Sequence, residues 1–187
     1  MMQTSPKSMT LTFPTIKRNQ FSTDQLTSRP QPKMPLHRIF VPKGLYTPED
    51  KEAISQAITA VYTNPPVSLP AFYVIVLFID LDPANIFVGG KSTDRFVRIA
   101  VEHIARNFTD DARKRVFMDR YEQVLEPFTK GRGIDWEVQV ADQDRLLWNL
   151  NGMAPPQANT EEENIWKKEN RAVPPEEIEA LRAQGRL

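Results

Sequence analysis

The chain has 187 residues, with 24 Lys and Arg against 24 Asp and Glu, no cysteine and two histidines. This is the length of one domain, and no window approaches the roughly 18 to 20 uninterrupted apolar residues of a membrane span, which excludes a transmembrane protein. Without cysteine there is no disulfide framework, thiolate zinc site or cysteine nucleophile. The balanced charge also provides no net excess of basic residues that would favour nucleic acid. We therefore expect no metal, no cofactor, no nucleic acid and no membrane among its partners.

Residues 1–33 are rich in serine and threonine and contain a single acid, Asp24. No packed element is predicted in them, and we expect a disordered or removable amino-terminal extension. Three origins are open: translation starts at Met34, the segment is a cleaved targeting peptide, or it stays attached. The expected location is the cytoplasm, or the mitochondrion if residues 1–33 are a transit peptide.

The next part of the chain predicts a strand, a helix and a second strand. Residues 36–41 have strand character, and Thr47 then predicts a helix N-cap, with Pro48 at the first helical position. Apolar residues recur at three- and four-residue spacing until residues 64–66, Asn-Pro-Pro, which end the helix. Residues 72–79 are a continuous apolar run, which predicts a central strand covered on both faces.

The following part repeats this pattern. Gly89-Gly90 predicts a tight turn, and residues 96–104 predict a strand whose apolar members and His103 alternate with charged residues. Residues 110–128 predict a second helix, and residues 136–140 predict the last clear strand. The order of elements predicts an α+β fold, an α/β sandwich in which two β-α-β units place their helices on one sheet.

The prediction for the whole chain is one folded domain over residues 35–153 followed by a tail. Residues 154–187 hold four prolines, seven glutamates and few large apolar residues. We expect them to form a surface-hugging or loose carboxyl-terminal segment, with one helical stretch from Pro175 to Arg182.

Several separated motifs resemble the cis-3-chloroacrylic acid dehalogenase group of the tautomerase superfamily. The resemblance covers about residues 35–153 and implies two β-α-β units per chain, a homotrimer, and a catalytic amino-terminal proline that is exposed when the initiator methionine is removed. Pro35 follows Met34 and is the implied proline. The motifs are Met34-Pro35-Leu36-His37-Arg38-Ile39-Phe40, Thr47-Pro48, Ala57-Ile58-Thr59 and Asn85-Ile86-Phe87-Val88-Gly89-Gly90.

The resemblance also implies substrate-binding positions. Where the family has an Arg-x-x-Arg pair that holds the substrate carboxylate, this chain has His103 and Arg106, and Arg106 is the expected anchor. Tyr62 stands at the position of a family histidine, and Asn149 stands opposite a family glutamate that activates water. An amide cannot deprotonate water, so hydration by the family's route is disfavoured.

His37 and Tyr73 are further candidates from the strand pattern. In a strand that begins near residue 35, His37 alternates onto the same side as Pro35, which places it near the proline, although a surface histidine is an equal alternative. Tyr73 is a less favoured candidate for a hydroxyl that faces the site.

The leading functional hypothesis is a keto–enol tautomerase that acts on a small carboxylate substrate, a 2-keto or enol acid, with Pro35 as general base. The first alternative is a non-catalytic trimeric ligand-binding or scaffold protein of the same fold. The second is a hydratase or dehalogenase activity on an unsaturated acid.

Overall fold

The computed structural model describes residues 35–104 and 106–186, so the expectation for residues 1–33 lies outside the described residues. A four-stranded sheet with the order β2-β1-β5-β6 forms its centre. β1 is parallel to β2, β5 is parallel to β6, and β1 and β5 are antiparallel. The strands are β1 (Leu36–Pro42), β2 (Ile75–Leu81), β5 (Phe96–His103) and β6 (Asp135–Asp142).

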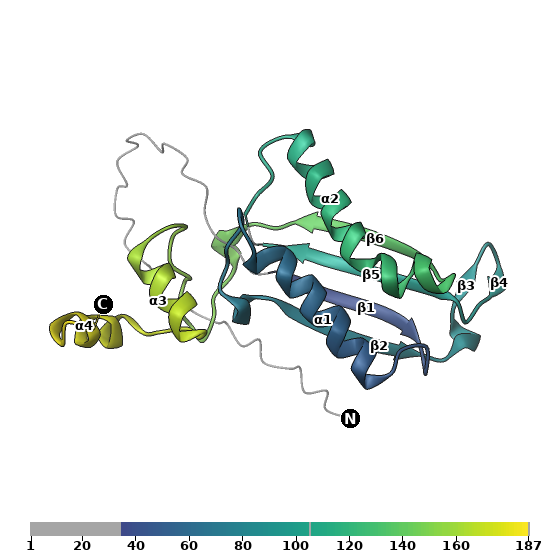
Figure 1. The fold of residues 1–187 in the computed structure, drawn as a ribbon, viewed down its shortest axis with the longest axis horizontal. Helices are drawn as coiled ribbons and strands as arrows, with labels where there is room; N and C mark the ends of the chain where they lie inside the picture. The colour runs from purple at the N-terminus through teal and green to yellow at the C-terminus, as the bar shows by residue number, and fades with distance from the viewer. Residues whose placement is uncertain (1–34, 105, 187) are drawn as a thin grey trace, which may run out of the picture.

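Two helices connect the parallel pairs, α1 (Pro48–Thr63) between β1 and β2 and α2 (Asp111–Leu125) between β5 and β6. Both lie on the same side of the sheet, α1 over β1 and β2 and α2 over β5 and β6 (Figure 1). The predicted sandwich of two β-α-β units is confirmed. The remaining elements are β3 (Phe87–Val88), β4 (Lys91–Ser92), α3 (Glu161–Glu169), α4 (Pro175–Ala183) and the short 3₁₀ turns η1 (Ala71–Tyr73), η2 (Pro83–Asn85), η3 (Glu126–Phe128), η4 (Lys130–Arg132) and η5 (Arg145–Leu147).

α1 begins and ends as the sequence predicts. The Thr47 hydroxyl accepts from the Asp50 amide, the Asp50 carboxylate accepts from the Thr47 amide, and Pro48 occupies the first helical position. These contacts satisfy amide groups that have no partner inside the helix. The helix ends before Asn64, and the last buried residues of its apolar stripe are Val61 and Tyr62.

The sheet has one face under the helices and one face that the helices leave open. Along β5 the buried and half-buried side chains alternate, and His103 is buried with the apolar residues, as predicted. On the open face, Arg38 pairs with Glu102 and Arg98 pairs with Glu137 across neighbouring strands. The tight turn predicted at Gly89-Gly90 is also confirmed, because it joins β3 to β4 and both glycines have positive φ.

The prediction that residues 72–79 form a central strand is wrong. β2 lies at an edge of the sheet and starts only at Ile75, because residues 71–73 form the turn η1. Val76 packs toward the core, whereas Ile75 and Leu77 face the open side and are 39% and 46% exposed. A continuous apolar run shows that both faces of a strand are apolar, but it carries no information on the strand's neighbours.

The carboxyl-terminal segment contributes to the core. Ile165 and Trp166 on α3, Val173 and Ile178 are buried and belong to the same hydrophobic cluster as the sheet and its helices. The helix predicted from Pro175 to Arg182 corresponds to α4, whereas the sequence patterns did not predict α3. Within the described residues no helix is both long enough and apolar enough to cross a bilayer.

Candidate active site

Pro35 lies at the end of the sheet where β1 and β2 begin and β5 ends. It is buried directly before β1, and its carbonyl accepts from the Ile75 amide at 3.1 Å. The antiparallel register pairs Leu36 with Glu102, so Pro35 stands opposite His103. Pro35, predicted to be catalytic, and His103, predicted to bind substrate, therefore lie opposite each other at the adjacent ends of β1 and β5.

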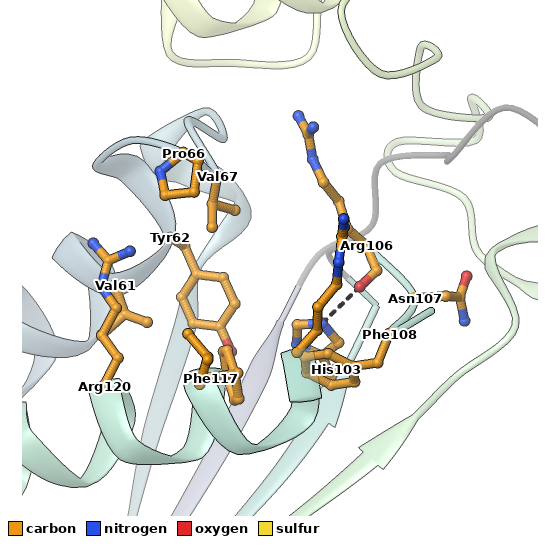
Figure 2. A pocket seen from close by; sticks show the side chains of 12 residues that line it. Val61, Tyr62, Pro66, Val67, His103, Arg106, Asn107, Phe108, Phe117 and Arg120 are labelled. Carbon is orange, nitrogen blue, oxygen red and sulfur yellow. Dashed lines mark hydrogen bonds between the residues drawn. The ribbon is translucent and has the colours of Figure 1, made fainter. Parts of the chain in front are cut away.

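A cavity of about 450 Å³ opens at this end of the molecule between α1, α2 and the segment that follows β5 (Figure 2). It brings together Tyr62, His103 and Arg106, three of the predicted substrate-binding residues. Pro35, His37 and Asn149 are not among its lining residues. The lining consists of Val61, Tyr62, Pro66, Val67, His103, Arg106, Asn107, Phe108, Arg113, Val116, Phe117 and Arg120.

The cavity combines apolar walls with positive charge. Arg106, Arg113 and Arg120 line it, and among the described residues no aspartate or glutamate does. Arg113 lies 3.4 Å from the Asp110 carboxylate outside the cavity, and Arg120 donates to the Pro65 carbonyl at 3.4 Å. Guanidinium groups on an apolar surface favour an organic anion such as a carboxylate.

His103 supports the backbone that carries Arg106. Its Nε2 lies 2.9 Å from the Arg106 carbonyl, and a carbonyl only accepts, so this nitrogen carries the proton and donates. The ring also stacks on Phe108, with ring centroids 4.4 Å apart. The Nε2 hydrogen of His103 is therefore engaged in holding the segment after β5.

Tyr62 presents a buried phenol at the cavity wall. Among the described residues its hydroxyl has no hydrogen-bond partner, and its ring packs against His37, His103 and Phe117. Burial raises the pKa of Tyr62 well above its ordinary value, so the group stays neutral and remains a hydrogen-bond donor.

His37 lies behind Tyr62 and away from solvent. Its side chain is fully buried, Nδ1 lies 2.7 Å from the Tyr121 hydroxyl, and the two rings stack. Burial, with a smaller contribution from His103, lowers the pKa of His37 to about 3. The alternative of a surface histidine is wrong, because strand alternation carries this side chain under the helices.

Asn149 is exposed and follows the turn η5, outside the cavity lining. The structure therefore does not bring it together with Tyr62, His103 and Arg106. Among the described residues no group of three or more histidine, aspartate and glutamate side chains is arranged to hold a metal ion.

Sequence patterns missed Glu163, a charged residue near the cavity. It lies on α3, is 3% exposed, and its Oε2 is 3.8 Å from Nη2 of Arg106. The nearby Tyr73, wedged between Trp148 and Trp166, is fully buried. Burial and then the charge of Glu163 raise the pKa of Tyr73. No sequence signal marks Glu163, because it belongs to a run of three glutamates that is typical of a solvated helix start.

Comparison with protein families gives one matching model, described as "Putative oxalocrotonate tautomerase enzyme", over residues 34–171. The comparison with curated proteins finds no match. The crystal structure of RhCC from Rhodococcus jostii RHA1 is 42% identical, with a TM-score of 0.71, and the alignment covers 74% of this chain and 99% of RhCC.

Two further solved structures are similar. One is described as a probable enzyme from the thermophilic fungus Aspergillus fumigatus; it is 40% identical, with a TM-score of 0.71, and the alignment covers 76% of this chain and 98% of that one. The other is N1, described as a member of the cis-3-chloroacrylic acid dehalogenase family. Its 18% identity and TM-score of 0.53, over 72% of this chain and 97% of N1, show a shared fold.

Proposed function

Because this chain belongs to the tautomerase family whose model matches residues 34–171, we propose that it interconverts the keto and enol forms of a small 2-keto carboxylic acid. Membership confirms the resemblance found in the motifs that begin at Met34-Pro35. The main support for the activity is the cavity lined by Tyr62, His103 and Arg106 at the end of the sheet where Pro35 precedes β1.

Pro35 acts as the base only when its nitrogen is the chain terminus. In a peptide bond the proline nitrogen shares its lone pair with the carbonyl, whereas a terminal secondary amine has a free lone pair. Burial disfavours a charged amine, so a free Pro35 is in an environment that favours its neutral, basic form.

The proposed reaction requires the Pro35 nitrogen to reach the substrate that Arg106 binds. Arg106 binds the substrate carboxylate, and the neutral Tyr62 hydroxyl is available to donate to a substrate oxygen. The Pro35 nitrogen takes the proton from the carbon next to the keto group, the C–H electron pair forms the C=C bond, and the carbonyl oxygen becomes an enolate. The protonated Pro35 then gives its proton to that oxygen, which yields the enol and regenerates the base.

Tautomerisation is favoured over hydration or dehalogenation of an unsaturated acid. Those reactions need a carboxylate that deprotonates water, and the corresponding residue, Asn149, has an amide that cannot do so. Enol–keto exchange needs only the base and the groups that bind the acid.

A second candidate function is ligand binding without catalysis. It is favoured by the residues that precede Pro35 in the chain, because any residue bonded to its nitrogen makes it an amide. The arginine-lined cavity would still bind an anionic ligand in that form.

We also propose a homotrimer, as the resemblance implies. The helices leave one face of the sheet open, and on this face Ile75 and Leu77 of β2 are exposed near cross-strand ion pairs. A face with both apolar and paired polar groups is suited to permanent contact with another copy of the chain.

The state of the amino terminus is tested by mass spectrometry of the native protein. A chain that starts at Pro35 supports the enzyme and a cytoplasmic location, and a cut elsewhere within residues 1–33 supports a transit peptide and a mitochondrial location. A complete chain with all 34 preceding residues supports the ligand-binding alternative.

Activity is tested on phenylenolpyruvate with protein that starts at Pro35, by the change in ultraviolet absorbance as the keto form appears. We expect Pro35→Ala to lower kcat by at least about 100-fold, the usual contribution of a positioned acid–base group. The control is Pro83→Ala, a proline in η2 outside the cavity lining. Equal activity of the Pro35→Ala variant and the parent protein would exclude Pro35 as the base.

A further inference from the structure

Glu163 is buried more deeply than its role at the helix end requires. α3 is capped by Thr160, whose hydroxyl accepts from the Glu163 amide at 3.2 Å, while Oε2 of Glu163 accepts from the Asn159 amide at 2.6 Å. Asp50 makes comparable capping contacts on α1, yet those contacts are exposed. Enclosing a carboxylate at 3% exposure costs desolvation energy, which a nearby positive charge offsets.

Arg106 provides such a charge, as Arg145 also does, and the Arg106 side chain has little other support. It lies between β5 and α2, in a segment without regular structure, and His103 holds only its backbone carbonyl. Among the described residues its buried Nε has no hydrogen-bond partner. At 3.8 Å, Glu163 is close enough to attract the guanidinium without occupying its N–H groups in a hydrogen bond. The donors of Arg106 therefore stay available at the cavity.

We propose that Glu163 is a positioning residue for Arg106, supplied to the active site by the carboxyl-terminal segment. An arginine side chain loses rotamer entropy when it is ordered. The buried carboxylate behind the guanidinium holds it over the cavity before the substrate arrives, so the substrate does not bear this cost. This inference rests on the proposed role of Arg106 as carboxylate anchor.

Removing the charge of Glu163 has two opposing effects on the binding of an anion. The substrate carboxylate would no longer be repelled by a second carboxylate behind Arg106, which strengthens binding. Arg106 would also lose its orientation, which weakens binding. If Glu163 positions Arg106, the second effect dominates and the variant binds the anion more weakly. Tighter binding would show that repulsion dominates.

The test compares Glu163→Gln with Glu162→Gln, which makes the same change one residue earlier on α3. Glutamine keeps an oxygen for the Asn159 amide, so the cap is retained, and Glu162 pairs with Arg182 away from the cavity. Binding of phenylpyruvate is measured by calorimetry, with its methyl ester as a neutral probe. We expect Glu163→Gln to raise Kd for the acid about tenfold, the lower end of what the loss of an orienting partner costs at metal sites, and to leave Kd for the ester and kcat unchanged.

Arg106→Ala separates this inference from the proposed function. If Arg106→Ala weakens binding of the acid and Glu163→Gln adds nothing in that background, Glu163 acts through Arg106. Unchanged or tighter binding by Glu163→Gln, when Arg106→Ala weakens binding, overturns the positioning role alone. Loss of turnover in Pro35→Ala bears only on the enzyme hypothesis.

A second measurement needs no ligand. Nuclear magnetic resonance of the Arg106 Nε–H group reports the mobility of the guanidinium on the picosecond-to-nanosecond timescale. We expect an ordered group in the parent and in Glu162→Gln and a mobile group in Glu163→Gln. An equally ordered Arg106 in all three proteins would overturn the proposal.

Discussion

His37 is a basic side chain that the fold keeps uncharged. Its ring is enclosed between the sheet and the helices, with Tyr121 as its hydrogen-bond partner. Burial lowers its pKa from 6.5 to about 3. The unfolded chain therefore binds a proton below pH 6.5 that the folded chain does not bind until about pH 3. The free energy of unfolding thus decreases as the pH is lowered across this interval.

The expected loss at pH 5 is about 2 kcal/mol, from 1.36 kcal/mol for each pH unit below 6.5. His37→Asn removes this contribution, because asparagine places an amide where Nδ1 meets the Tyr121 hydroxyl and does not titrate. Urea unfolding of both proteins at pH 7 and pH 5 measures the difference. If the parent and the variant lose the same stability between these pH values, the protonation of His37 is not coupled to unfolding.

Among the secondary-structure elements, β2 has one face packed against the core and one face exposed on the open side of the sheet. Its residues alternate between the helix-covered side and the open side, where Leu77 is 46% exposed. The strand forms although its open face is uncovered, because its backbone hydrogen-bonds to β1 along one edge. On its helix-covered face, Val76 and Phe78 pack against the hydrophobic cluster. The open side is thus available for assembly without a change in the fold.

We expect Leu77→Lys to convert the proposed trimer to monomers, because a desolvated ammonium would lie in the contact between sheets. Far-ultraviolet circular dichroism should show an unchanged fold, since the side chain is already partly exposed in the single chain. Analytical ultracentrifugation measures the mass. Gln56→Lys adds the same charge on the exposed side of α1 and should remain a trimer; a trimeric Leu77→Lys variant would place the interface elsewhere.

In the whole molecule, the carboxyl-terminal segment packs against the end of the sheet where β2 begins. Trp166 packs against Phe72 and Tyr73 next to the start of β2, and its indole N–H donates to the Val173 carbonyl at 2.9 Å. The family match also extends past residue 153, to residue 171. α3 therefore belongs to the same structural unit as the two β-α-β halves.

Trp166→Ala tests this unity. We expect it to lower the free energy of unfolding by about 3 to 5 kcal/mol, as for other buried tryptophans, since it leaves a void beneath α3. Denaturant unfolding followed by circular dichroism gives the value, and Lys167→Ala on the exposed side of the same helix is the control. A loss below about 1 kcal/mol would mean that α3 is not part of the cooperative core.

Local sequence patterns predicted the two β-α-β units, the capped start of α1 and the buried face of β5, because periodicity and capping residues act over a few neighbouring positions. The sequence also indicated Tyr62, His103 and Arg106 through the resemblance. The packing of the folded chain was needed to show that β2 is an edge strand, that His37 is buried, that Asn149 lies outside the cavity lining and that Glu163 reaches Arg106. Those facts depend on which distant segments pack together, and side chains 57 positions apart, such as Arg106 and Glu163, leave no local pattern that records their contact.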